Sequence, residues 1–231
     1  MTAIELQPRD GYWSWRATSG AVGVRFAGKP LSRGPDRREA AFLHLSPGGV
    51  EPAWLRQVHS ASVIDARPGD NGPGDALTTG LPGLGLAVVT ADCVPVLLAA
   101  GSEIAAVHAG WRGLAGRIVP AAVERLWRRQ RGAIIAWIGP AIGPCCYEVG
   151  EDVAARVAGA SAPEVIRDGT RGRPHLDLAA AARLQLRGLG VEDVRETGGC
   201  TRCDERLCSY RRDGPRAGRN VALIWREANR G

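Results

Sequence analysis

The segment from Ala87 to Gly116 constrains the fold more than any other part of the chain. Three short apolar runs rich in β-branched residues follow one another in it: Ala87–Thr90, Val94–Ala99 and Ile104–Val107. Asp92 and Cys93 separate the first two runs, and His108 directly follows the third. A glycine-rich stretch and then a helical pattern come after His108. Such runs indicate buried strands, and α/β proteins place sites where strands end and helices begin. The segment therefore predicts a strand-end site.

The remainder of the chain alternates predicted strands and helices. Further strands are expected near Tyr12–Trp15 and at Val22–Phe26, Ala53–Val58, Ser62–Ala66, Ala133–Gly139, Val191–Glu196 and Asn220–Trp225. Helical patterns cover Arg37–Leu45, Arg112–Arg131, Gly150–Ala158 and Asp177–Leu189, the last with Asp177 as its N-cap. Gly28–Arg38, Arg67–Gly80, Pro140–Tyr147 and Gly198–Gly218 are expected to be loops. With 231 residues, 45% of them apolar, we expect one domain over residues 1–231: an α/β fold of the mixed α+β kind, a layered sandwich of mixed sheets flanked by helices.

Composition narrows the partners and the compartment. No apolar leader or membrane-length segment is present, so we expect a cytoplasmic protein without membrane contact. The formal charge of +6 comes almost entirely from arginines interleaved with acidic residues. That pattern favours a small anionic substrate over nucleic acid, and it leaves monomer and homodimer open. The six cysteines are expected to be thiols or ligands rather than disulfides.

His59, Cys93 and His108 are the candidate metal ligands. Each follows an apolar strand, and a set of two imidazoles and one thiolate suits Zn²⁺ with a fourth position open for water or substrate. Their spacing matches no short local motif. On these residues alone, a buried thiol with hydrogen-bonded core histidines is therefore the favoured interpretation.

Five motifs occur in the order of a known family: RQVHSASV (56–63), TADCVPVLLA (90–99), AVHAGWRGLAGRIV (106–119), IGPAIGPCCYEVG (138–150) and SYRRDGPRAGR (209–219). From about residue 53 onward the chain resembles the YfiH-like proteins. These are variously called multicopper polyphenol oxidases, peptidoglycan editing factors and purine nucleoside phosphorylases. The resemblance implies a YfiH-like fold and a zinc ion bound by His59, Cys93 and His108, with copper as the alternative metal. It also implies phosphorolysis of adenosine, inosine and methylthioadenosine, with adenosine deamination as a second activity.

The predicted reaction assigns roles to further residues. Backbone N–H groups from Gly110 onward and the Arg112 guanidinium would bind phosphate at a helix N-terminus. Arg211, Arg212 and Arg219, in the loop of the last motif, are further candidate phosphate ligands, with a solvated basic loop as the alternative. The resemblance favours Arg211 among them. Asp92, beside Cys93, is the predicted proton carrier, and the predicted catalytic residues are therefore Asp92, Cys93 and Arg112. The alternative role of Asp92 is to cap a turn or to orient a ligand histidine.

Several residues fall outside this assignment or depart from the family. The resemblance in the IGPAIGPCCYEVG motif suggests that Cys145 and Cys146 line the substrate site, with buried structural thiols as an equal alternative. Cys200, Cys203 and Cys208 have spacing that invites a second zinc site, but they lack a fourth ligand, so we do not favour it. Residues 17–36 preserve little of the family's arginine-and-glycine loop, which puts the substrate preference in doubt. Arg25 is the one candidate to replace the arginine of that loop.

Three alternative activities stay open to different degrees. A laccase needs on the order of ten histidines by the His-rich ligand sets that copper uses, and the chain has four, which leaves only weak oxidation by adventitious copper. Cys93 could act as a nucleophile with His108 as its base in a cysteine-dependent amide hydrolase. A metal-dependent amide hydrolase that edits peptidoglycan precursors would use the same residues as the phosphorylase.

Overall fold

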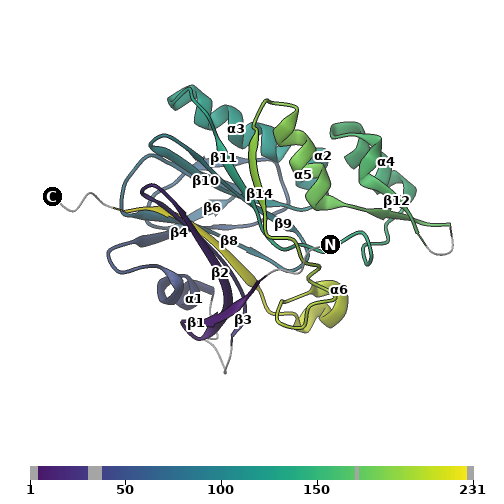
Figure 1. Cartoon of the computed structure of the whole chain (residues 1–231), viewed down its shortest axis with the longest axis horizontal. Coiled ribbons are helices and arrows are strands. Elements are labelled where there is room, and N and C mark those ends of the chain that lie inside the picture. The colour runs from purple at the N-terminus through teal and green to yellow at the C-terminus, as the bar shows by residue number, and fades with distance from the viewer. Residues whose placement is uncertain (1–4, 31–37, 170–171, 228–231) are drawn as a thin grey trace.

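Two stacked β-sheets form the centre of the molecule, and helices cover their outer faces (Figure 1). The computed structural model describes residues 5–30, 38–169 and 172–227. Within these ranges the first sheet has the order β1-β2-β3-β15-β8-β4-β6, and the second has the order β14-β11-β9-β10-β7-β5. Parallel and antiparallel pairs occur in both sheets, as in β4–β8 and β15–β8 of the first. The predicted fold class, a mixed α+β sandwich flanked by helices, is confirmed.

The elements have the following bounds. The first sheet contains β1 (Gln7–Arg9), β2 (Tyr12–Ser19), β3 (Val22–Pro30), β4 (Glu51–Arg56), β6 (Gly69–Pro73), β8 (Leu84–Thr90) and β15 (Asn220–Arg226). The second contains β5 (Val63–Asp65), β7 (Ala76–Thr79), β9 (Val94–Ala100), β10 (Glu103–Ala109), β11 (Ile135–Ile138) and β14 (Asp193–Glu196). A separate ribbon pairs β12 (Ile166–Asp168) with β13 (Pro174–Leu176). The α-helices are α1 (Arg38–Leu45), α2 (Trp111–Ala115), α3 (Ile118–Arg129), α4 (Glu151–Ala160), α5 (Leu178–Arg187) and α6 (Tyr210–Asp213).

Alternating side chains bury both faces of each sheet. In β9, Val96 and Leu98 pack among residues of α2 to α5, whereas Leu97 packs against the first sheet. In β15, Ile224 faces the second sheet and Leu223 belongs to the cluster around α1. Successive side chains of a strand point to opposite faces, so strands buried on both sides need nearly continuous apolar runs. This explains why the central runs of the sequence are apolar throughout.

The break between the first two apolar runs is the point where the chain passes from one sheet to the other. β8 belongs to the first sheet and β9 to the second. Asp92, in the connection, has a positive φ of 91°, a backbone conformation that few non-glycine residues adopt. The connection places Asp92 and Cys93 at the edge shared by both sheets.

Three local predictions are wrong. The expected loop Gly198–Gly218 contains α6, a helix of four residues. The expected loop Arg67–Gly80 contains β6 and β7, because strands of four or five residues leave too little apolar pattern to outweigh their flanking glycines and prolines. The expected helix Arg112–Arg131 is divided into α2 and α3 by Arg117, whose φ is 61°.

The other predicted elements lie close to their expected positions, whereas β1, β12 and β13, each of three residues, were not predicted. The N-cap prediction for Asp177 is confirmed, since its carboxylate accepts a hydrogen bond from the Ala180 N–H at 2.9 Å. The expected helix start at residue 37, and most of the predicted loop before it, lie outside the described residues. Within the described residues, no helix combines the length and apolar character that a membrane span requires.

Candidate metal centre

Strand order brings the three predicted metal ligands together. β4 and β8 run parallel, so the residues that follow them, including His59 and Cys93, lie at the same edge. β10 runs antiparallel to β9 and ends where β9 begins, so His108 pairs in register with Pro95, near Cys93. One ligand atom from each of His59, Cys93 and His108 lies within 4.8 Å of the others. The structure therefore places the three donor groups in one cluster.

Asp75 holds two of these donors, and the sequence analysis missed it. Its buried carboxylate lies 2.8 Å from His108 Nδ1 and also accepts hydrogen bonds from the His59 N–H at 3.0 Å and the Ser60 hydroxyl at 2.7 Å. With Nδ1 engaged, Nε2 is the His108 nitrogen that remains for a ligand. A carboxylate–histidine pair of this kind is the usual support of a metal-binding imidazole. The available signal was an aspartate directly before a short apolar run, inside a segment assigned as a loop.

The charges of the cluster favour a thiolate. Burial raises the pKa of the Cys93 thiol, but hydrogen bonds from His108 and His59 outweigh it and lower that pKa to about 6. Burial lowers the pKa of His108, whereas its hydrogen bonds with Asp75 and Cys93 raise it to about 9. A thiolate beside imidazole rings is the donor form that a metal requires.

Gly110 leaves the space that the cluster needs. A Cβ at this position would lie 2.9 Å from Cys93 Sγ and 3.2 Å from His59 Cδ2, closer than side chains pack without displacement. The role predicted for Gly110 was phosphate binding, but this close approach explains the glycine without a ligand. Together with the mixed nitrogen and sulfur donor set, it shows that the residues fit a metal ion.

A pocket of about 520 Å³ opens beside the cluster, which is within the usual size range of small-molecule sites. Its lining residues are Gln57, His59, Val89, Thr90, Ala91, Asp92, Cys93, His108, Trp111, Arg112, Tyr147, Tyr210, Arg211 and Arg219. Arg112 lies over the Trp111 ring at 4.5 Å, and Arg211 lies over the Tyr147 ring at 5.1 Å. In the described part of the chain, no carboxylate pairs with Arg112, Arg211 or Arg219. The pocket wall thus carries three guanidinium groups that form no ion pair with a described carboxylate, although Asp92 also lines the pocket.

Asp92 connects the pocket to the C-terminal loop. Its carboxylate accepts hydrogen bonds from the Thr201 hydroxyl and from the Arg211 N–H, both at 2.6 Å. Both oxygens are therefore engaged in anchoring the segment that carries Arg211. The orienting role towards a ligand histidine belongs to Asp75 rather than to Asp92.

The structure separates other predicted residues from this pocket. Cys145 does not line it and lies instead among other cysteines. Arg212 donates hydrogen bonds to backbone carbonyl groups of its own loop, including those of Thr201 and Leu207. Arg25 is buried in β3 and pairs with Asp10, so it does not replace a pocket arginine.

Comparison with known proteins defines the family. The model of the family described as multi-copper polyphenol oxidoreductase laccase matches residues 36–227. The chain belongs to this family. The chain is similar to a protein named purine nucleoside phosphorylase YfiH from Escherichia coli K12, with 38% identity over 200 residues, 83% of this chain and 82% of that protein. The resemblance to YfiH-like proteins is thereby confirmed.

Further relatives carry the same name. A purine nucleoside phosphorylase of Streptomyces coelicolor is 44% identical over 201 residues, 81% of this chain and 80% of that protein. One of Deinococcus radiodurans is 44% identical over 178 residues, 74% of this chain and 69% of that protein. Among solved structures, YlmD from Geobacillus stearothermophilus has a TM-score of 0.78 and 30% identity, covering 90% of this chain and 93% of that one.

Proposed function

We propose that this protein is a zinc-dependent purine nucleoside phosphorylase that acts on adenosine, inosine and methylthioadenosine. The observation that carries the proposal is the composition of one pocket. The metal-donor cluster, aromatic rings and arginines free of acidic partners in the described chain share its wall. The names of the relatives, given above, support the same reaction.

Arginines of the pocket would bind the phosphate. Guanidinium groups bind phosphate oxygens through paired hydrogen bonds, and Arg112 and Arg211 each lie over an aromatic ring that limits their orientations. Backbone N–H groups contribute less than the sequence suggested, because α2 has only five residues and a single turn sums few peptide dipoles. We therefore assign phosphate binding to Arg112 and Arg211, with Arg219 at the same pocket.

Aromatic side chains would hold the purine. Trp111, Tyr147 and Tyr210 line the pocket, and flat rings stack well on purine faces. Burial and the neighbouring Cys93 charge raise the pKa of Tyr147 to about 12. Its hydroxyl therefore stays protonated at neutral pH and can donate a hydrogen bond to the base.

The reaction exchanges one bond at the sugar. A phosphate oxygen forms a bond to C1′ while the bond from C1′ to the purine nitrogen breaks, and the released base takes the electron pair and a proton. Arg112 and Arg211 position the nucleophile, which removes much of the entropic part of the barrier. A zinc ion on His59, Cys93 and His108 would supply Lewis acidity and acidify a bound water. The deamination expected from the family would draw on this same chemistry.

Substitution of Arg112 tests the assignment. Arg112→Ala should raise the KM for phosphate about tenfold or more, with a smaller change in the KM for adenosine, because one charged hydrogen-bonding group contributes about 1.5–3 kcal/mol. Arg128→Ala removes an equally exposed arginine on α3, away from the pocket, and should leave both constants unchanged. A larger effect on adenosine than on phosphate would contradict the role of Arg112.

A cysteine-dependent amide hydrolase is the second candidate, and one observation favours it. Cys93, His108 and Asp75 form a continuous chain of thiol, imidazole and carboxylate, the order used by nucleophilic cysteines. This activity needs Cys93 free of metal. One equivalent of tightly bound zinc that is lost in Cys93→Ala would argue against it.

A further inference from the structure

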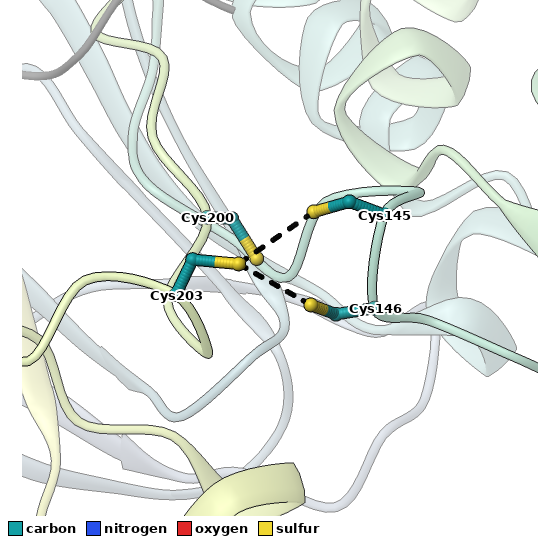
Figure 2. Close-up of side chains that lie close together, drawn as sticks. All are labelled: Cys145, Cys146, Cys200 and Cys203. Carbon is teal, nitrogen blue, oxygen red and sulfur yellow. Dashed lines mark hydrogen bonds between the residues drawn. The ribbon is translucent and has the colours of Figure 1, made fainter.

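Four cysteines outside the pocket converge at the molecular surface. Cys145 and Cys146 lie in the loop after β11, whereas Cys200 and Cys203 lie in the loop after β14. Their four sulfur atoms all lie within 4.8 Å of one another. Figure 2 shows the two pairs on opposite sides of a common centre, with their sulfurs directed towards it. Two loops far apart in the sequence thus meet at these sulfur atoms, and the Thr201 N–H also donates to the Ala141 carbonyl group at 3.0 Å between them.

Tight turns present the sulfurs on the same side. The Cys146 N–H and the Tyr147 N–H donate to the Gly143 carbonyl group at 3.0 and 3.1 Å. This turn lets two adjacent cysteines approach one partner, Cys203. In the second loop, the Cys203 N–H donates to the Cys200 carbonyl group at 3.1 Å. That pair has the C-x₂-C spacing of structural zinc sites.

We propose that Cys145, Cys146, Cys200 and Cys203 bind one Zn²⁺ ion as a closed structural site. Zinc–sulfur bonds of about 2.3 Å in a tetrahedron place neighbouring sulfurs about 3.8 Å apart. Cys145 Sγ lies 3.8 Å from Cys203 Sγ, and Cys146 Sγ lies 3.3 Å from it. Cys145 and Cys203 are exposed, so the small adjustment of Cys203 meets little resistance.

The surroundings suit the charge of such a site. Four thiols release four protons as they bind Zn²⁺, which leaves a net charge of −2 on the ion and its ligands. The Arg202 guanidinium lies 3.5 Å from Cys146 Sγ, and the Gly143 N–H donates to Cys200 Sγ at 3.2 Å. Both contacts stabilise negative sulfur. Cys208 is not part of the cluster, since it is buried beside Asn220.

The site would join the loop that carries the pocket residue Tyr147 to the loop that contacts the pocket residue Asp92. Tyr147 directly follows Cys146, and Thr201, which follows Cys200, donates to Asp92 at 2.6 Å. Four protein ligands leave no open position for substrate. The zinc would therefore be structural, and its presence does not depend on the activity proposed above.

Metal analysis of cysteine variants tests the proposal. In protein purified under reducing conditions without chelator, Cys203→Ser and Cys145→Ser should each contain one zinc equivalent less than the unchanged protein. Cys208→Ser, the matched control, should lose none. Cys93→Ala leaves the four cysteines intact, so it should retain one zinc equivalent. The double variant Cys93→Ala with Cys203→Ser should retain none.

Cobalt and thiol measurements complete the test. Cys93→Ala loaded with Co²⁺ should show thiolate-to-metal charge-transfer bands together with the d–d bands of a tetrahedral site. In the same variant, bound zinc should protect four thiols from alkylation. These measurements on Cys93→Ala still test the proposal if Cys203→Ser does not fold. Equal zinc in Cys203→Ser and the unchanged protein would overturn the proposal. So would iron with acid-labile sulfide at these cysteines, or a disulfide in place of metal.

Discussion

Asp75 supports the candidate metal centre at the scale of single residues. It contacts the His108 ring, the His59 backbone and Ser60 at the same time. One carboxylate therefore orients the His108 ring and anchors the backbone of His59, two donors that lie 49 residues apart in the sequence. Cys93, the third donor, lies beside the His108 ring that Asp75 orients.

Asp75→Asn should weaken zinc binding about 10- to 100-fold, the usual cost of losing a carboxylate behind a metal-binding histidine. An amide can still accept a hydrogen bond, so the fold should be retained. Competition titration with a chromogenic chelator measures the affinity. Asp70→Asn, an exposed change in β6, serves as the control, and equal affinities in the two variants would contradict the role of Asp75.

The same carboxylate predicts a pH dependence of stability in the metal-free protein. Burial raises the pKa of Asp75, but hydrogen bonds from His108 and Ser60 outweigh it and lower the pKa from 3.8 to about 2. Because the folded-state pKa lies below the unfolded value, the ionised group stabilises the fold above about pH 4, and this contribution is lost as the pH falls towards 2. When the pH falls from 5 to 3, the free energy of unfolding should decrease in both proteins, and the decrease should be about 1 kcal/mol larger in the unchanged protein than in Asp75→Asn. Urea denaturation at both pH values measures this, and parallel losses would contradict it.

At the scale of elements, the junction between β10 and α2 matters most. Gly110 lies between the end of the strand and the single turn of α2, against Cys93 and His59. The chain then bends again at Arg117 before α3 begins. The expected single helix after His108 would not bend in this way. The periodicity of the sequence therefore predicted the buried face of the helix but not its division at Arg117.

Gly110→Ala should reduce the zinc content of the pocket by displacing Cys93 and His59, while the fold persists. Gly159→Ala, in α4, meets no atom within 4 Å and should leave the metal in place while stabilising the protein by about 0.5–1 kcal/mol. Elemental analysis and thermal unfolding of both variants check the pair. Full zinc in Gly110→Ala would show that the close approach does not matter.

At the scale of the whole molecule, the two stacked sheets explain what the sequence could and could not predict. Long apolar runs on both sides of Cys93 and before His108 identified the strands, because burial on two faces leaves a strong pattern. β7 is only four residues long, so Asp75 before it was concealed in an expected loop. Its pairing with β10, which sets Asp75 beside His108, is a long-range contact that no local pattern encodes.

The cysteine cluster illustrates the same limit. Cys200 and Cys203 have local zinc spacing, but their partners lie more than fifty residues earlier in the chain. Sequence proximity suggested Cys208 as a partner, whereas the fold supplies Cys145 and Cys146. Cys145 was expected in the substrate site because of the motif that its loop shares with the family, but in that loop it is Tyr147 that lines the pocket.

The most direct test of the proposed function is product analysis with adenosine and inorganic phosphate, using protein of measured zinc content. We expect adenine and ribose 1-phosphate in equal amounts, with no cleavage when phosphate is omitted and none by Cys93→Ala or His108→Ala. Failure of zinc-loaded protein to form ribose 1-phosphate would contradict the assignment.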